Sequence, residues 1–214
     1  LVIHVDEHAR QALAAWFAKT LPADGDVLDL MSAWRSHLPD DAHYASVIGQ
    51  GMNTTELWEN PALTGRLIQD LNVLPSLPFK DASFDAVILS FSMQYLTQPV
   101  AILAEVARVL KPGGWIAAAV WSAPEKNPSI GIPMAAIKQV IDLPPLDPNA
   151  PGIFRLARPG DLAGMLQQAG LTDVTKQEFL SEWSYETAEE YYTRLIEVAA
   201  PVQHLLAKLS DAQK

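Results

Sequence analysis

Short apolar runs alternate with longer amphipathic runs through the first 120 residues of the chain. Each apolar run is nearly continuous, as expected for strands that helices cover on both faces of a parallel sheet. The pattern predicts five strands, at residues 26–30, 44–48, 66–71, 84–91 and 115–121. This alternation indicates an α/β fold with a doubly wound, mainly parallel sheet and flanking helices.

Helix signals stand between the predicted strands. Asn53 can cap a helix over residues 54–60, and Pro99 suits the first turn of a helix that runs to Leu110. Apolar residues recur at helical spacing in the second of these, until the Lys-Pro-Gly-Gly turn at residues 111–114 ends it. Each helix thus connects two strands that we expect to be parallel.

The second half of the chain begins with a change in composition. Prolines crowd residues 122–158 around one predicted helix at 134–141, which indicates a lid or connector. The α/β pattern then returns with a helix at 160–169 and a strand at 171–179, and a last helix is predicted at about 188–209. We expect no further strand after it.

Length and composition narrow the class of protein. The 214 residues, 49% of them hydrophobic, suit a single domain over residues 1–214. The net charge is −10 and no basic block can follow a phosphate backbone, so we expect no nucleic-acid partner. Cysteine is absent, which excludes disulfides and thiolate zinc sites. Neither a membrane-spanning run nor a signal peptide is found, so we expect a soluble, cytoplasmic protein with no membrane partner.

The most specific motifs lie between residues 77 and 114. They are Leu77-Pro78-Phe79-Lys80-Asp81-Ala82-Ser83-Phe84-Asp85-Ala86-Val87, then Tyr95-Leu96, then Glu105-Val106-Ala107-Arg108-Val109-Leu110-Lys111-Pro112-Gly113-Gly114. In this order and spacing they resemble the class I S-adenosylmethionine-dependent methyltransferases, particularly the small-molecule, methyltransferase type 11 group. The resemblance implies a Rossmann-like fold, S-adenosylmethionine as cofactor and a small organic acceptor. Members usually end with one more strand beside the fifth, and we expect that strand to be missing here.

The turn after the first predicted strand departs from that family. Its members have glycines there that wrap the methionine part of the cofactor, whereas Met31, Ala33 and Arg35 stand at places where small residues are usual. Asp29 and Ser32 still match the polar positions. Arg35 either pairs with the cofactor's carboxylate, since a guanidinium suits that anion, or is a surface residue. Residues 29–39, together with residues 49–53, also resemble a subgroup of methyltransferase-like proteins with an Asp-Leu-Met-Ser-x-Trp signature.

The resemblance can be followed to the next two strand ends. The acid that closes strand two in the family accepts hydrogen bonds from the ribose, but Gly51 has this place, and Asn53 or Glu56 can substitute from the following helix. Asp70 and Leu71 stand where the family holds adenine. The cofactor-binding residues that the resemblance implies are Asp29, Ser32, Arg35, Asn53, Asp70, Leu71 and Ser90.

Other candidates have two interpretations each. Gln94 and Tyr95 follow the fourth strand, at the edge where open α/β sheets bind ligands, and are the substrate-side candidates. Trp34 either stacks on a ligand or packs in the core, and His37 is either a general base or structural. The stretch at residues 4–8 fits the zinc-peptidase pattern H-x-x-E-H, but solvated residues of a helix start explain it better, and we expect no metal.

Two functions remain open from the sequence. One is a methyltransferase that aligns a small acceptor with S-adenosylmethionine and needs no strong nucleophile, so that no catalytic residue is assigned. The other is a noncatalytic binding or scaffold domain, because Met31, Trp34 and Gly51 alter the cofactor turn. An NAD-dependent dehydrogenase is less favoured, since G-x-G-x-x-G does not follow the first strand. The acceptor and the oligomeric state are not indicated, and the chain is expected to be a truncated or recombined form.

Overall fold

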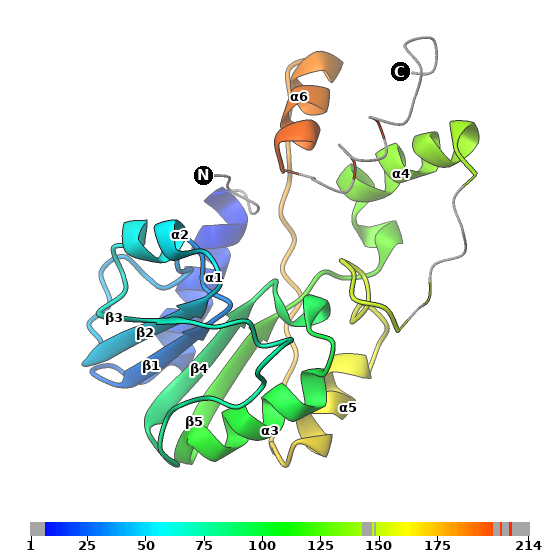
Figure 1. Cartoon of the computed structure of the whole chain (residues 1–214). Coiled ribbons are helices and arrows are strands. Elements are labelled where there is room, and N and C mark those ends of the chain that lie inside the picture. The colour runs from blue at the N-terminus through cyan, green and yellow to red at the C-terminus, as the bar shows by residue number, and fades with distance from the viewer. Residues whose placement is uncertain (1–6, 143–146, 148, 199–201, 203–205, 207–214) are drawn as a thin grey trace.

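The computed structural model of the chain describes residues 7–142, 147, 149–198, 202 and 206. Its centre is a parallel sheet with the strand order β3-β2-β1-β4-β5 (Figure 1). The strands are β1 (Asp26–Leu30), β2 (Ser46–Gly51), β3 (Gly65–Ile68), β4 (Phe84–Ser90) and β5 (Leu110–Ala119). The direction of winding reverses between β1 and β4, and ligands of open α/β sheets bind at such a point.

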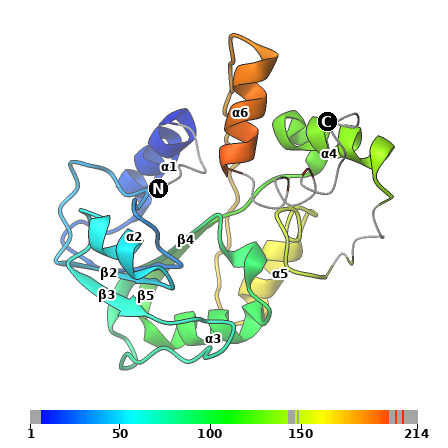
Figure 2. The same ribbon diagram turned by 45° about the horizontal axis from the view of Figure 1, so that its top comes forward.

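Helices cover both faces of the sheet, which confirms the predicted doubly wound fold. One face carries α1 (Glu7–Thr20), and the other carries α3 (Pro99–Val109) and α5 (Asp161–Gln168) (Figures 1 and 2). The remaining described elements are α2 (Thr54–Glu59), α4 (Pro128–Val140), α6 (Ala188–Val198) and the short 3₁₀ turns η1 (Met93–Tyr95) and η2 (Pro124–Lys126).

Two apolar cores fix the sheet between these helices. On the α1 side, Leu13 and Phe17 pack with Val27, Ala86 and Ile88, and Phe17 is only 1% exposed. On the other side the core joins β1 and β4 to α3 and α5, through Leu28, Leu30, Val87, Leu89, Ile102, Leu103, Val106 and Leu166. Alternate residues of β1 and β4 thus enter opposite cores, as the period of a strand requires.

Residues of the motif at 77–114 form hydrogen bonds and an ion pair between α3 and the loop before β4. Glu105 accepts a hydrogen bond from the Leu77 amide at 2.7 Å. Arg108 donates to the carbonyls of Leu77 and Phe79 at 2.9 and 2.8 Å and pairs with Asp81 at 2.8 Å. The same guanidinium lowers the pKa of Glu105. The acid and the arginine of this motif therefore hold the loop that leads into β4.

Element ends shift for identifiable reasons. β2 continues to Gly51 because that residue still pairs with Ile68 of β3. β3 ends there because the Asp70 carboxylate accepts the Asn72 amide at 2.8 Å, which begins a turn. The proline-rich helix begins at Pro128, earlier than the predicted residue 134. The predicted last helix is described as α6 only to Val198, and most of residues 199–209 lie outside the described part.

The predicted strand at residues 171–179 is wrong. The segment is extended, but no strand forms within the described residues 171–187. Only Leu171 and Val174 reach the core, while the polar residues between and after them stay exposed. Lys176 pairs with Glu178 at the surface instead. Two apolar residues that pack against the core are too few to fix the register of this segment against an edge of the sheet.

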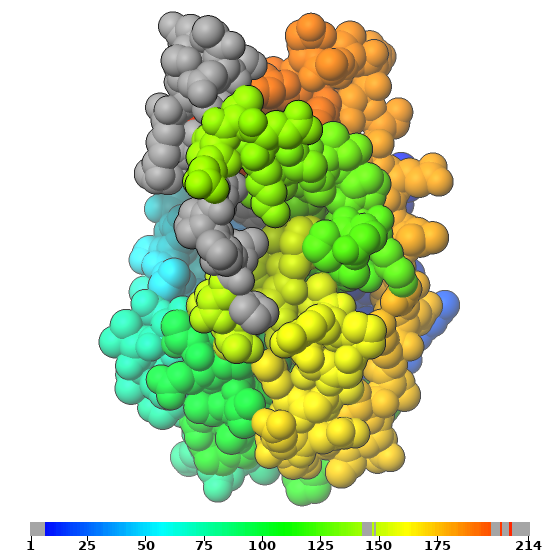
Figure 3. Space-filling model, turned by 90° about the vertical axis from the view of Figure 1, so that its right-hand side faces the viewer, coloured from blue at the N-terminus to red at the C-terminus, as the bar shows by residue number. Residues whose placement is uncertain are grey.

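The proline-rich region has two parts, the helix α4, which packs with α6, and a following segment that packs against η1. α4 and α6 stand beyond the carboxyl ends of the strands, where the Tyr191 hydroxyl donates to the Ser129 carbonyl at 2.6 Å (Figure 1). Figure 3 shows α4 above α5 on one face of the molecule. The Gly152 amide, however, donates to the Gln94 carbonyl at 3.2 Å, and Arg155 reaches the Leu96 carbonyl. The end of this region is thus held against η1. None of the described helices combines the length and the apolar character needed to cross a membrane.

Candidate functional site

Asp29 organises the turn after β1 from inside the protein. It is 4% exposed, and its Oδ2 accepts hydrogen bonds from the hydroxyls of Ser32 and Ser36, both at 2.6 Å. Burial raises the pKa of Asp29 to about 6, and the two hydroxyl donors act in the opposite direction. The polar side chains of Asp29 and Ser32, predicted to bind the cofactor, are therefore hydrogen-bonded to each other in the structure.

Gln50 extends the pairing of β1 and β2 beyond Leu30. Its side-chain oxygen accepts the Met31 amide at 3.0 Å, and its carbonyl accepts the Ser32 amide at 2.7 Å. Its side-chain amide donates to the Gln69 carbonyl at 2.7 Å, and the residue is 1% exposed. Sequence reasoning missed Gln50, although a glutamine inside an apolar strand was a signal, because a buried amide needs partners.

Asn60 holds the other side of the same turn. Its side-chain amide donates to the Ala33 carbonyl at 2.8 Å and to the Ser36 hydroxyl at 3.1 Å, and the residue is fully buried. Asn60 directly follows α2, so the turn after β1 is tied to the helix after β2. This role could hardly be predicted from the sequence, since an asparagine at a helix end is usually a cap.

The end of β2 has no room for a ribose-binding carboxylate. A Cβ atom on Gly51 would lie 2.6 Å from the Ser32 carbonyl oxygen, which is closer than such atoms approach. The place of the expected acid is therefore taken by main chain of the β1 turn. Asn53 does not replace the acid freely either, because its side chain accepts the Glu56 amide and caps α2. Glu56 itself is only partly exposed.

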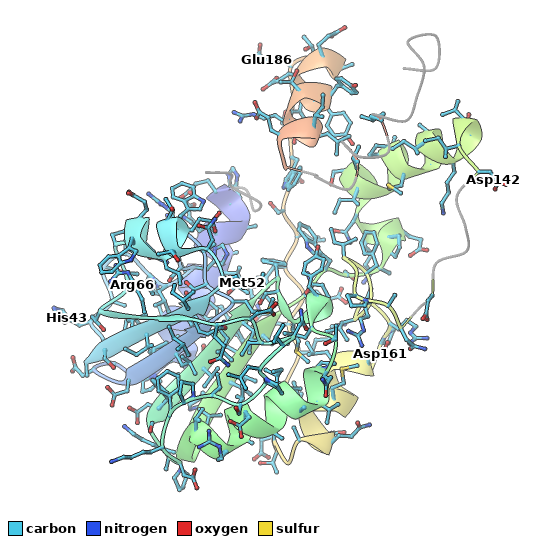
Figure 4. All side chains as sticks on the ribbon, viewed as in Figure 1. His43, Met52, Arg66, Asp142, Asp161 and Glu186 are labelled. Atoms are coloured by element: carbon cyan, nitrogen blue, oxygen red, sulfur yellow. The ribbon has the colours of Figure 1, made fainter. Side chains whose placement is uncertain are left out.

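The ends of β2 and β3 form a second part of the site. The main-chain amide of Gln69 donates a hydrogen bond to the Gly51 carbonyl at 3.0 Å, which brings the two strand ends together. Met52, labelled in Figure 4 and 64% exposed, follows one of them. The half-buried Asp70 follows the other in sequence. Leu71 is 4% exposed and packs in the core, so its side chain is not presented to a ring. Met52 is the apolar surface that the sequence analysis overlooked.

The turn after β4 gathers buried polar atoms. Within the described part of the chain, the atoms that lack a hydrogen-bond partner are the Ser90 and Ser92 hydroxyls, the Gln94 side-chain oxygen and His37 Nδ1. Ser90 and Ser92 flank Phe91, Gln94 donates to the Phe91 carbonyl at 2.7 Å, and the His37 ring lies 6.3 Å from the Phe91 ring. Buried polar atoms usually have a partner, so these atoms are available to an ordered water or to polar groups of a ligand.

His37 is a neutral imidazole in this setting. Burial, assisted by the charge of Arg10, lowers its pKa to about 4. Its ring meets the edge of Phe91, which in turn packs against Trp121 at 5.0 Å. Near pH 7 His37 is therefore uncharged and can accept a hydrogen bond, but burial disfavours its protonated form.

The remaining candidates differ in their exposure. Arg35 is exposed and its guanidinium lies over the Trp34 ring, 5.7 Å from the ring centre. Gln94 is fully buried, whereas Tyr95 is 43% exposed, and partial burial raises the pKa of its hydroxyl. Of the two substrate-side candidates, Tyr95 is the one that presents its side chain outward.

A metal site receives no support from the described residues, among which no group of three or more His, Asp or Glu side chains is arranged to hold an ion. The H-x-x-E-H stretch lies partly outside that region, since residues 1–6 are not described. Glu7 is engaged with Arg10 through a 2.7 Å ion pair on α1.

The motifs and the strand order together point to the same family resemblance. Residues 51–118 match the family model described as a methyltransferase domain. This region and the fold are similar to those of the class I S-adenosylmethionine-dependent methyltransferases. The matched region contains the ends of β2, β3 and β4 and most of β5, which are the strands that form the site described above. S-adenosylmethionine is the cofactor that this family implies.

Curated relatives share part of the chain. A demethylmenaquinone methyltransferase of Clavibacter sepedonicus is 34% identical over 107 residues, 50% of this chain and 40% of that protein. Another, from Renibacterium salmoninarum, is 47% identical over 53 residues, 25% of this chain and 22% of that protein. The chain spans less than half the length of these relatives.

Solved structures show the same fold at low sequence identity. The YcgJ protein of Bacillus subtilis has a TM-score of 0.55 at 16% identity, covering 95% of this chain and 86% of that one. An S-adenosylmethionine-dependent methyltransferase of Thermotoga maritima has a TM-score of 0.50 at 16% identity, covering 75% and 70%. Both support the Rossmann-like architecture.

The fit of S-adenosylmethionine to the site is uneven. The unpartnered Ser90 and Ser92 hydroxyls after β4 suit polar groups of a ligand, and Met52 beside Asp70 suits a flat heterocycle with an amine. At the end of β2 the usual carboxylate is absent and Ser32 main chain stands in its place. The residues present therefore fit the adenine and the amino-acid end better than they fit the family's way of holding ribose.

Proposed function

We propose that the chain binds S-adenosylmethionine and transfers its methyl group to a small organic acceptor. The observation that carries this proposal is the group of unpartnered buried polar atoms around Phe91, at the point where the winding of the sheet reverses. Ligands of open α/β sheets bind there, and these atoms offer hydrogen bonds to a ligand that displaces water from them.

The named side chains divide the work of binding. Ser90 and Ser92 provide hydroxyls for the methionine end, and Asp70 accepts from the exocyclic amine of adenine while Met52 lies against the ring. Tyr95 is on the acceptor side. The cofactor supplies an already activated methyl group, so the protein needs to align the acceptor and exclude water rather than provide a nucleophile. His37, neutral near pH 7, can offer a hydrogen-bond acceptor beside Phe91.

The acceptor is a small molecule in this proposal, and α4 with α6 forms a lid over the carboxyl ends of the strands. The relatives whose names specify a substrate act on demethylmenaquinone, which favours an organic acceptor over a macromolecule. The net charge of −10 is consistent with that choice, since it opposes binding to nucleic acid or an anionic membrane surface. A cytoplasmic location is part of the same proposal.

A noncatalytic binding domain is the second candidate. The specific observation in its favour is the turn after β1, where Met31 replaces a glycine and Ser32 main chain contacts Gly51. A domain that kept the fold but closed this turn would bind the adenosyl group weakly or not at all. Binding of the product S-adenosylhomocysteine therefore separates the two candidates.

Calorimetric titration of the purified chain with S-adenosylmethionine and S-adenosylhomocysteine tests the proposal. At about 100 times the dissociation constant a ligand adds about 2.7 kcal/mol. For this chain length that raises the melting temperature by about 5 to 11 °C. Ser92→Ala should weaken binding about tenfold, whereas Ser83→Ala, at the other end of β4, should not. If millimolar ligand produces no heat and no melting shift, the noncatalytic domain is favoured. If the ligand binds, an assay of methyl transfer from labelled cofactor to a panel of small acceptors establishes or excludes catalysis.

A further inference from the structure

The carbonyl group of Ser32 occupies the space that a side chain at Gly51 would fill. A Cβ atom on Gly51 would lie 2.6 Å from the Ser32 carbonyl oxygen. In an aspartate, ordinary bond lengths place each carboxylate oxygen about 2.4 Å from Cβ. The Ser32 oxygen is thus about as far from this point of β2 as an oxygen of an aspartate side chain would be.

We propose that the Ser32 carbonyl accepts the hydrogen bonds of the ribose hydroxyls, in place of a carboxylate at the end of β2. This inference rests on the proposed function, since it requires an adenosyl ligand. In nucleotide-binding α/β folds the ribose acceptor follows the first βα turn by about 20 residues. Gly51 has that position after the turn that begins at Met31, and main chain fills the space beside it.

The carbonyl is held rigidly enough to act as such an acceptor. The Ser32 amide donates to the Gln50 carbonyl at 2.7 Å, and the next carbonyl, of Ala33, accepts from Asn60 at 2.8 Å. The Ser32 hydroxyl is tied to Asp29 at 2.6 Å. Both peptide groups around the proposed acceptor and its side chain are therefore fixed before a ligand arrives, and a preorganised acceptor loses little entropy on binding.

This arrangement explains why the two unusual features of the site occur together. Gly51 is needed because any side chain would collide with the Ser32 carbonyl, and the turn at Met31 is held against β2 by the hydrogen bond of its amide to the Gln50 side chain. Restoring the acid with Gly51→Asp would then displace the acceptor. The inference predicts a loss of affinity from that change, whereas a vacant acid position predicts a gain.

The decisive experiment combines a variant with an altered ligand. S-adenosylhomocysteine and its 2′,3′-dideoxy analogue are titrated by calorimetry into the parent chain, Gly51→Ala and Gly164→Ala. Gly164 is a matched control, because a Cβ atom there meets no neighbour. The parent and the control should each lose at least tenfold in affinity when the hydroxyls are removed. Gly51→Ala should bind S-adenosylhomocysteine at least tenfold more weakly and lose little more with the analogue, because the same interaction is already gone.

Each other result has a definite meaning. The inference is overturned, with the proposed function intact, if Gly51→Ala loses as much affinity as the parent does when the ribose hydroxyls are removed. A gain of affinity by Gly51→Asp overturns it in the same way. No binding of S-adenosylhomocysteine by the parent overturns both. If circular dichroism shows that Gly51→Ala does not fold, a crystal structure of the parent with S-adenosylhomocysteine decides: a ribose hydroxyl within hydrogen-bond distance of the Ser32 carbonyl supports the inference, and any other ribose acceptor overturns it.

Discussion

Met31 and Phe91, the residues that directly follow the neighbouring strands β1 and β4, both have left-handed backbone, with φ of 53° and 54°. Neither is glycine, and this conformation costs about 1 to 2 kcal/mol for other residues. Hydrogen bonds hold both in place, since Met31 donates to the Gln50 side chain and Phe91 to the Ala119 carbonyl at 2.8 Å. Backbone strain on both sides of the switch point is the kind that proteins retain at binding sites.

The strain at Met31 predicts an inverted order of two substitutions. Met31→Gly should be more stable than Met31→Ala by about 1 kcal/mol, because glycine accepts positive φ and alanine does not. At exposed Ala104 in α3, the change to glycine should instead cost about 1 kcal/mol. Urea unfolding of the three variants measures both differences. Equal stability of the two Met31 variants would show that the turn relaxes.

The architecture was predictable because its signals are local. The alternation of apolar runs located all five strands of the sheet, and Asn53 and Pro99 marked helix starts that the structure confirms. The failure at residues 171–179 has a physical cause. Leu171 and Val174 gave that segment a strand-like pattern, but whether a strand pairs depends on an edge that is distant in sequence.

The site was harder to predict than the fold, because its geometry comes from contacts between strands. Gly51 alone indicated a missing acid, and only the structure shows that Ser32 main chain takes its place. Gln50 and Asn60 fix the turn from β2 and from the end of α2, at separations that no local pattern records. The assignments of Arg35, Asn53 and Ser90 to the cofactor remain predictions.

The buried Asp29 predicts a pH dependence of stability with a definite sign. Its folded pKa of about 6 lies above the ordinary 3.8, so the native state binds the proton more tightly than the unfolded chain. Ionised Asp29 therefore costs stability above pH 6, by about 3 kcal/mol, and this cost is lost as the pH falls from about 7 to about 4. Asp29→Asn carries no such cost at any pH.

The measurement is the difference in unfolding free energy between Asp29→Asn and the parent, by urea at pH 8, 6 and 4. The difference should move in favour of the variant by about 3 kcal/mol between pH 4 and pH 8. His37, whose pKa is lowered, destabilises both proteins at acid pH and cancels in the difference. A difference that does not change with pH would mean that Asp29 is ionised throughout this range.

Asp70 predicts discrimination between adenine and a related base. Asp70→Asn keeps an oxygen to accept the Asn72 amide but removes the charge that is proposed to face the exocyclic amine. Affinity for S-adenosylhomocysteine should fall by about 1 to 3 kcal/mol. S-inosylhomocysteine, which has a carbonyl in place of the amine, should bind the variant at least as well as it binds the parent. Calorimetry with both ligands tests this, and equal losses for both would move the base away from Asp70.

Arg35 predicts a contribution that depends on one end of the ligand. Its guanidinium is exposed and lies over Trp34, so it is free of the buried network that ties Asp29, Ser32 and Asn60 together. If it pairs with the carboxylate of the amino-acid end, Arg35→Ala should weaken S-adenosylhomocysteine by about 1.5 to 3 kcal/mol, the usual value for a hydrogen bond to a charged group. Methylthioadenosine lacks that carboxylate and should bind both proteins equally. Because the residue is exposed, the melting temperature without ligand should hardly change. A loss of equal size for both ligands would instead assign Arg35 to the shape of the turn, through its contact with Trp34, and would leave the carboxylate to the hydroxyls after β4.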